Sequence, residues 1–155
     1  MTTATIHATA LILGHRGILI RGPSGSGKSA LALSFLQSAK GTFARLVGDD
    51  RIRVEVAHGR LLVRPATALQ GLIEIRGLGV ARVPFEPLAV AHLVVDLAAS
   101  DAQRLPQSTD LVTSIEGIRL ARLPVAPGGN ARARLLAFLM DGGDFFTLAD
   151  IRSGR

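Results

Sequence analysis

The sequence predicts an α/β fold in which a nucleotide-binding phosphate loop is joined to a mixed, largely antiparallel sheet. Two observations support this class. A glycine-rich loop lies between an apolar run and a helical pattern, and most of the remaining chain alternates apolar and polar residues as strands do. The 155 residues are 48% hydrophobic and 19% charged, which suits a globular protein with one ordinary core. We therefore expect a single domain over residues 1–155, with a loose tail from about 141.

The chain is expected to begin with a β-hairpin. Apolar and polar side chains alternate over residues 5–13, with His7 and Thr9 on the polar side, which predicts one continuous strand. The turn at 14–17 then leads into the apolar run 17–20, which we expect to form the second strand. The phosphate loop is thus expected to follow the second strand of an antiparallel pair, unlike the loop of a simple parallel nucleotide-binding sheet.

The next segment satisfies the phosphate-loop pattern of a glycine, four variable residues and Gly-Lys-Ser. Its residues are Gly22, Pro23, Ser24, Gly25, Ser26, Gly27, Lys28 and Ser29. Glycines let backbone N–H groups turn inward and bind an anion, Lys28 can reach the β- and γ-phosphates, and Ser29 can ligate Mg²⁺. A helix expected over 30–36 would direct its N-terminal dipole at the phosphates. We expect the Lys28 ammonium to be solvated without nucleotide. A chance glycine turn is the alternative reading.

Two carboxylates, Asp49 and Asp50, follow the next expected strand, which covers residues 43–48. In phosphate-loop proteins this position lies beside the phosphates, where a carboxylate can organise Mg²⁺ or accept a proton. The alternative is an acidic turn that ends a strand. Further strands are expected over 51–56, 61–64, 88–97 and 118–123.

An unusual segment at 71–80 combines a carboxylate, a guanidinium and a Gly-x-Gly bend. On an extended backbone Glu74 and Arg76 share one face, which suits contacts with a metal and a phosphate, although a surface ion pair accounts for the spacing equally well. Downstream, the polar stretch 100–109 contains Arg104 and is expected to form a loop. Asn130 is expected to cap a helix that ends near Met140.

Charge and composition exclude several classes of function. The net charge of +6 comes from scattered arginines, and the chain has neither Tyr nor Trp for base stacking, so we expect no nucleic-acid partner. The most apolar window, 88–99, is too short and too polar to span a bilayer, so no membrane partner is expected. Cysteine is absent and the N-terminus has no signal-peptide pattern, which favours a cytoplasmic protein.

Taken together, these motifs resemble the bacterial HPr kinase/phosphorylase family, specifically its catalytic C-terminal domain, over about residues 5–139. The resemblance rests on the loop 22–29, on Asp49 and Asp50 after Leu46-Val47, and on the Glu-Ile-Arg-Gly-Leu-Gly segment at 74–79. It implies a nucleotide core similar to that of phosphoenolpyruvate carboxykinase, ATP and Mg²⁺ as cofactors, and a homo-oligomer, commonly a hexamer. The implied reaction is phosphorylation of a serine in HPr, the small carrier of the sugar phosphotransferase system. In reverse, inorganic phosphate attacks phosphoserine-HPr.

The resemblance also implies roles for individual residues. Asp49 matches the catalytic aspartate and His7 an active-site histidine, while Lys28 contacts the phosphates and Arg104 resembles an arginine tied to phosphorolysis. The expected metal site contains Ser29, Glu74 and Asp50.

The chain departs from the family pattern in three places. The family's usual N-terminal domain does not appear, so the chain looks like a short form. Gly129 stands where the family's Pro-Gly-Arg-Asn has its arginine, and the segment from 141 does not resemble the basic helix that longer members use against HPr. Other readings are a kinase or hydrolase for a small molecule, and a nucleotide-binding regulatory module without turnover.

Overall fold

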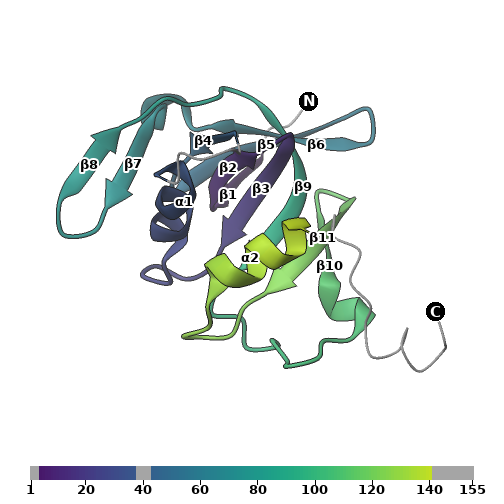
Figure 1. Ribbon diagram of the computed structural model, residues 1–155. Helices are drawn as coiled ribbons and strands as arrows, with labels where there is room; N and C mark the ends of the chain where they lie inside the picture. Colours follow the sequence, from purple (N-terminus) through teal and green to yellow (C-terminus); the bar gives the residue numbers. More distant parts are fainter. Residues whose placement is uncertain (1–3, 38–42, 141–155) are drawn as a thin grey trace.

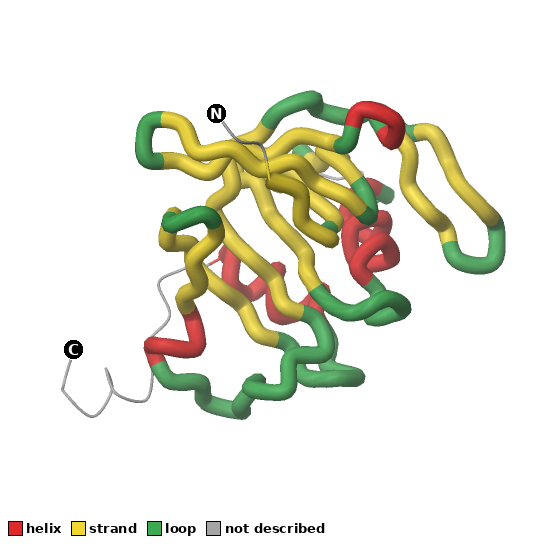
Figure 2. Tube along the Cα trace, turned by 180° about the vertical axis from the view of Figure 1, so that it is seen from behind, coloured by secondary structure: helices red, strands yellow, loops and turns green. Residues whose placement is uncertain are grey.

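The computed structural model describes residues 4–37 and 43–140, and the tail that the sequence predicts to be loose from about 141 lies outside them. A large sheet forms the body of the molecule, and helices α1 (Lys28–Leu36) and α2 (Ala131–Met140) lie over one of its faces (Figure 1). The same arrangement is seen from behind in Figure 2, where both helices lie beyond the strands. Neither helix in the described ranges is long and apolar enough to cross a membrane.

Within the described residues, the main sheet has nine strands. They are β1 (Ala4–His7), β2 (Thr9–Leu13), β3 (Arg16–Arg21), β4 (Ala44–Gly48), β5 (Arg51–Ala57), β6 (Arg60–Pro65), β9 (Ala89–Asp96), β10 (Val112–Ile115) and β11 (Ile118–Pro124). A separate hairpin joins β7 (Leu72–Ile75) to β8 (Gly79–Arg82), and two short 3₁₀ segments, η1 (Thr67–Leu69) and η2 (Ser108–Leu111), lie in connections.

The sheet is mixed and largely antiparallel, as the sequence predicts. Its main path runs β1-β5-β6-β9-β3-β2-β4. Strand β9 pairs in parallel with β3 and with β11, whereas the other pairings between described strands are antiparallel. One edge of β9 is shared, because β6 pairs with residues 89–90 and β11 with residues 93–96. The carboxyl ends of β3, β9 and β11 therefore meet at one border of the sheet.

The single strand predicted over residues 5–13 is wrong, because the chain is divided at Ala8 into β1 and β2. Strand β1 pairs with β5, while β2 pairs with β3 and β4, so the two halves belong to different parts of the sheet. The Ala8 N–H donates to the Asp50 carbonyl at 3.2 Å instead of to a strand neighbour. From Ala8 to Leu11 each side chain is fully buried, so the alternation of the sequence does not separate an inner from an outer face there.

Two apolar cores stabilise the sheet, one on each face. On the helix side, Leu31 and Phe35 of α1 and Leu135 of α2 pack against strand residues such as Ile18 and Val95. On the other face, strand residues supply the core together with Ala8, which lies at the break between β1 and β2. Leu19 and Val94 contribute to that second core, so β3 and β9 are buried on both faces. Strands covered on both faces have continuous apolar runs, which is the pattern of residues 17–20 in β3 and 93–95 in β9, whereas the exposed His92 interrupts the first half of β9.

Candidate active site

The phosphate loop connects the end of β3 to the start of α1, where the sequence predicts it. Gly22, Gly25 and Gly27 have positive φ angles of 155°, 81° and 97°. At Gly22 a side chain would also meet packed atoms, since a Cβ there would lie 2.5 Å from Ser26 Oγ and 3.1 Å from the Leu97 carbonyl oxygen. These positions therefore favour glycine, for its left-handed conformation and for its small size.

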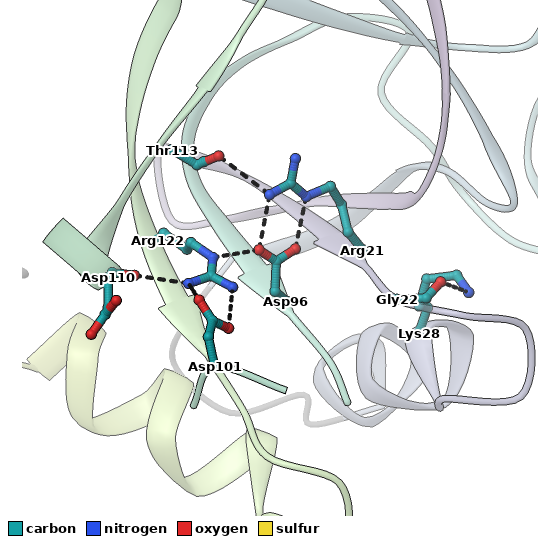
Figure 3. A network of polar contacts seen from close by, with 8 residues as sticks. All are labelled: Arg21, Gly22, Lys28, Asp96, Asp101, Asp110, Thr113 and Arg122. Atoms are coloured by element: carbon teal, nitrogen blue, oxygen red, sulfur yellow. Dashed lines mark hydrogen bonds and ion pairs between the residues drawn. The ribbon is translucent and has the colours of Figure 1, made fainter. Parts of the chain in front are cut away.

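Lys28 is the first residue of α1, and its ammonium lies against the loop. Its Nζ donates to the Gly22 carbonyl at 2.9 Å (Figure 3). It also donates to the Pro23 carbonyl at 3.1 Å, and the residue is only 8% exposed. The expectation of a solvated ammonium is therefore wrong. The loop carbonyls replace water as its partners, and this holds the charged group inside the loop, beside the backbone N–H groups that would bind an anion.

Asp49 is the central acceptor of the site. It is 5% exposed, and its carboxylate accepts three hydrogen bonds. Thr9 Oγ1 and Ser29 Oγ both donate to Oδ1 at 2.7 Å, and the backbone N–H of Glu74 donates to Oδ2 at 2.9 Å. Strand β2, the phosphate loop and the β7–β8 hairpin thus meet at one carboxylate. Sequence analysis singled out Ser29, Asp49 and Glu74 but gave no role to Thr9.

Asp50 is the neighbour of Asp49, yet its side chain is 67% exposed. Its backbone adopts a left-handed conformation with φ of 67°, which is uncommon outside glycine and is best tolerated by Asn and Asp. Its carboxylate lies 3.1 Å from His7 Nε2, the side chain that ends β1. The turn between β4 and β5 therefore presents one buried and one solvent-facing carboxylate.

An open pocket of about 400 Å³ brings most of the predicted site residues together. His7, Ser24, Gly25, Gly27, Lys28, Ser29, Asp49, Asp50 and Glu74 all line it, with Arg76. Arg76 lies in the turn after β7 rather than on the strand, and its guanidinium approaches the position of a Cβ on Gly25 to 3.4 Å. Within residues 4–37 and 43–140, no ion pair joins Glu74 to Arg76.

Four other predicted site residues do not line this pocket. Ser26 lines a second pocket instead. Pro23 is exposed at the start of the phosphate loop and Gly22 is half-buried, and neither is among the residues that line the first pocket. Arg104 is exposed in the connection between β9 and η2, and it is not among the residues that line the pocket.

A second pocket, of about 560 Å³, lies on the other side of the phosphate loop. Its far wall is the segment 125–132, between β11 and α2, and it shares Gly25, Gly27 and Ala30 with the first pocket. Asn130 caps α2 as predicted, since its Oδ1 accepts from the Ala133 N–H at 3.0 Å. The break and the cap were predictable from the sequence, whereas nothing in the sequence indicated that this segment faces the phosphate loop.

A network of ion pairs ties the strand ends together beside the loop (Figure 3). Arg21, directly before Gly22, donates twice to Asp96 at 2.7 and 2.8 Å, and Arg122 on β11 donates to the same carboxylate at 2.5 Å. Arg122 also binds both oxygens of Asp101 at 2.8 and 2.9 Å. The sequence could not reveal this network, because each arginine is one of many and the partners are distant along the chain.

The network changes the acidity of its members. Burial would raise the pKa of Asp96, but hydrogen bonds from Arg21 and Arg122, with the charges of both guanidinium groups, outweigh it and hold that pKa below its usual range. The Arg122 hydrogen bond likewise lowers the pKa of the exposed Asp101. Asp96 is therefore a permanent anion near neutral pH, and it neutralises two arginines at the border of the sheet.

The residues present fit a nucleotide with Mg²⁺. Ser26 Oγ is buried and has no hydrogen-bond partner among the described residues, as expected of a donor that awaits a phosphate oxygen. Ser29, Asp49, Asp50 and Glu74 offer hard oxygen atoms, which Mg²⁺ prefers. No group of three or more His, Cys, Asp or Glu side chains arranged to hold a metal occurs in the described part of the chain. Mg²⁺ at a phosphate loop does not need such a group of side chains, because phosphates and waters supply most of its ligands.

Comparison with known proteins gives the chain its family. The model of the HPr serine kinase C-terminal domain matches residues 1–137. HPr kinase/phosphorylase of Xylella fastidiosa (strain M12) is 34% identical over 143 residues, and that of Halalkalibacterium halodurans is 33% identical over 144 residues. These alignments cover 82% and 83% of this chain but 44% of each relative, so the chain spans less than half of their length.

A solved structure supports the fold independently. The HPr(Ser) kinase/phosphatase from Coxiella burnetii superposes with a TM-score of 0.74, covering 90% of this chain and 95% of that chain, at 23% sequence identity. The α/β fold with its mixed sheet is thus one already known. The family model matches residues 1–137, which is most of this chain, so the chain belongs to the HPr serine kinase C-terminal domain family.

Proposed function

We propose that this chain transfers the γ-phosphate of ATP, with Mg²⁺, to a serine of the protein HPr. The position of Asp49 carries the proposal. Its carboxylate is hydrogen-bonded to Ser29 of the phosphate loop and lines the pocket that opens beside Lys28. A proton acceptor fixed next to a phosphate-binding loop is what the phosphorylation of a hydroxyl requires.

The nucleotide would occupy both pockets. The segment 125–132 and the apolar side of α1 form a wall for the nucleoside, and the loop glycines shared by the two pockets would hold the phosphates between them. Volumes of about 560 and 400 Å³ lie in the usual range for small-molecule sites. The γ-phosphate would then face Asp49, Asp50 and Glu74.

In the proposed reaction the serine oxygen attacks the γ-phosphorus, the bond to the β-γ bridging oxygen breaks, and ADP leaves. Full loss of the serine proton before attack is implausible because a hydroxyl is far less acidic than a carboxylic acid, so the proton passes to Asp49 as the new bond forms. Lys28 and the loop N–H groups stabilise charge on the transferred group. Mg²⁺, held by Ser29 with Glu74 and Asp50, would neutralise the β- and γ-phosphate oxygens.

The reverse reaction can use the same groups. An oxygen of inorganic phosphate attacks the phosphorus of phosphoserine, the serine oxygen leaves with the proton from Asp49, and pyrophosphate forms. We include this phosphorolysis in the proposal because the relatives carry the name HPr kinase/phosphorylase. Arg104 lies outside the pocket that contains Asp49. For Arg104 to take part in phosphorolysis, its loop would have to approach the phosphates.

The test is a transfer assay with purified HPr, ATP labelled at the γ-phosphate, and Mg²⁺. We expect the label on one serine of HPr, dependence on Mg²⁺, and release of the label as pyrophosphate when unlabelled phosphate replaces ATP. Label found only in inorganic phosphate or in a small metabolite would replace the proposal with a hydrolase or small-molecule kinase. ATP binding with no labelled product would indicate a regulatory module.

Self-association and location stay predictions. The resemblance predicts a homo-oligomer, which light scattering coupled to size-exclusion chromatography would measure directly. The predicted cytoplasmic location and the predicted absence of a nucleic-acid partner follow from composition and sequence pattern, and fractionation of cells and a filter-binding assay would test them.

A further inference from the structure

Among the residues that the structure describes, the hydrogen-bond donors to the Asp49 carboxylate leave it a single unused acceptor position. A carboxylate offers about four lone-pair positions, two on each oxygen. Both positions on Oδ1 are taken, by the hydroxyls of Thr9 and Ser29, and one on Oδ2 is taken by the backbone N–H of Glu74. The remaining position belongs to Oδ2. Which oxygen of Asp49 is available for a proton is therefore decided by its donors.

Among these donors, Thr9 has no other evident task. Ser29 and Glu74 both line the pocket, whereas Thr9 is fully buried and does not. It lies on β2, which is paired on both sides, with β3 and with β4, so its backbone is fixed. Its β-branched side chain has few rotamers, which makes its hydroxyl a rigid donor. Thr9 thus approaches Asp49 from inside the sheet, where no substrate can reach it.

The strand break at Ala8 gives this contact its surroundings. Three consecutive residues hold the Asp49–Asp50 turn: His7 contacts the Asp50 side chain, the Ala8 N–H donates to the Asp50 carbonyl, and Thr9 donates to Asp49. In a continuous strand the Ala8 N–H would pair with a neighbouring strand. At the break it pairs with the Asp50 carbonyl instead, so the backbone between His7 and Thr9 is held to the same turn as their side chains.

We propose that Thr9 is a positioning residue for phosphoryl transfer. Together with Ser29 it saturates Oδ1 of Asp49, so that Oδ2 is the oxygen that takes the serine proton. The Ser29 hydrogen is also committed to Asp49, which leaves the lone pairs of the Ser29 oxygen free for the metal ion. This inference rests on the function proposed above, and it assigns a role to a residue that makes no contact with substrate.

The test compares variants that differ by one group. Thr9→Val keeps the shape and removes the hydroxyl, while Thr9→Ser keeps the hydroxyl and removes a methyl group. We expect Thr9→Val to lower kcat for HPr phosphorylation about tenfold or more with ATP affinity unchanged, because misplacement of a catalytic group acts on the transition state. Thr9→Ser should stay within about threefold of wild type. Thr5→Val, the same change at an exposed position of β1 that lines neither pocket, is the control.

A double-mutant cycle separates positioning from general structural support. If Thr9 acts through Asp49, Thr9→Val should have almost no further effect on kcat in an Asp49→Asn background, because the group it positions is already lost. Wild-type kcat in Thr9→Val, equal losses in the Ser and Val variants, or fully additive losses in the cycle would each overturn the inference.

A second pair of variants applies if Thr9→Val does not remain folded in a thermal melt. Thr9→Ser and Thr9→Ala then make the same comparison, since the Ser and Ala side chains differ by one hydroxyl oxygen. A wild-type chain that transfers no phosphate to HPr would overturn the proposed function and this inference together. An active wild type with unimpaired Thr9→Val and Thr9→Ala variants would overturn only the inference.

Discussion

Two adjacent aspartates show how far a single residue's setting can depart from that of its neighbour. Asp49 is 5% exposed with three donors, while the side chain of Asp50 is 67% exposed and has His7 as its one polar side-chain partner within residues 4–37 and 43–140. The left-handed backbone at Asp50 separates the two directions, and Asn would adopt that backbone as readily. Substitutions at the two positions can therefore be read separately.

At Asp49 we predict that Asn lowers phosphorylation and phosphorolysis together, by about 100-fold or more, because the amide cannot take the serine proton. ATP affinity should remain close to wild type, since the carboxylate is not required for the loop to bind phosphates. Both reaction directions and the nucleotide dissociation constant are measured on the same preparations. Normal transfer, or a loss explained wholly by weaker ATP binding, would remove Asp49 from this role and make Asp50 the next candidate.

For Lys28 we predict that Met abolishes transfer without unfolding the domain. Methionine fills the same space, and the two lost hydrogen bonds to loop carbonyls cost on the order of 1–3 kcal/mol in total. The charge that stabilises the transferred phosphate is absent, so the rate should fall at least about 100-fold. Transfer rate and urea unfolding are measured beside Arg119→Met, an exposed arginine on β11 that serves as the control. A Lys28→Met enzyme with near-normal rate would exclude a phosphate-loop mechanism.

At the scale of elements, the close approach of β3 to β9 depends on a glycine. A Cβ at Gly17 would lie 2.3 Å from the Val90 carbonyl oxygen, which is backbone and cannot move aside cheaply. We predict that Gly17→Ala lowers the free energy of unfolding by about 1–3 kcal/mol, as overpacking in a core does. Because β3 leads into the phosphate loop, ATP affinity should fall as well.

Urea unfolding and ATP titration check this prediction. Gly14→Asn is the control, since Gly14 has an open surrounding and a left-handed φ of 64° that Asn tolerates. If Gly17→Ala is as stable as wild type, the backbone of β9 at Val90 can shift to make room for the added methyl group, contrary to the prediction.

Local patterns explain which elements could be predicted from the sequence. The phosphate loop, the carboxylates after β4 and the Asn130 cap each depend on a few consecutive residues. The rest of the site depends on which strands become neighbours, which periodicity does not reveal. Thr9 and Asp49 are 40 positions apart, and Arg21 and Asp96 are 75 apart. For the same reason the break at Ala8 escaped prediction, because two different partner strands cause it.

For the whole molecule, we predict a loss of stability in acid through Asp96. Its pKa in the folded state lies below that of an unfolded aspartate, about 3.9, so the carboxylate stabilises the fold above that pH. The contribution is lost as pH falls through the lower folded pKa. The free energy of unfolding, measured with urea, should therefore decrease as the pH is lowered from about 5 to 2.5. Asp96→Asn should make this decrease smaller and should also lower the free energy of unfolding at pH 7.

Glu116→Gln, a loss of one exposed carboxylate in the turn between β10 and β11, controls for the change in net charge. An Asp96→Asn protein with the acid dependence of wild type would show that the arginine network does not contribute to this part of the pH profile.

The two pockets have separate walls and share three residues of the loop and the start of α1, namely Gly25, Gly27 and Ala30. The walls come from different parts of the chain, residues 125–132 for one and His7, Asp49 and the β7–β8 hairpin for the other. For inhibitor design this separation is useful. A compound confined to the larger pocket would compete with nucleotide and leave the protein-acceptor side open, so its inhibition should be competitive with ATP and noncompetitive with the phosphate acceptor.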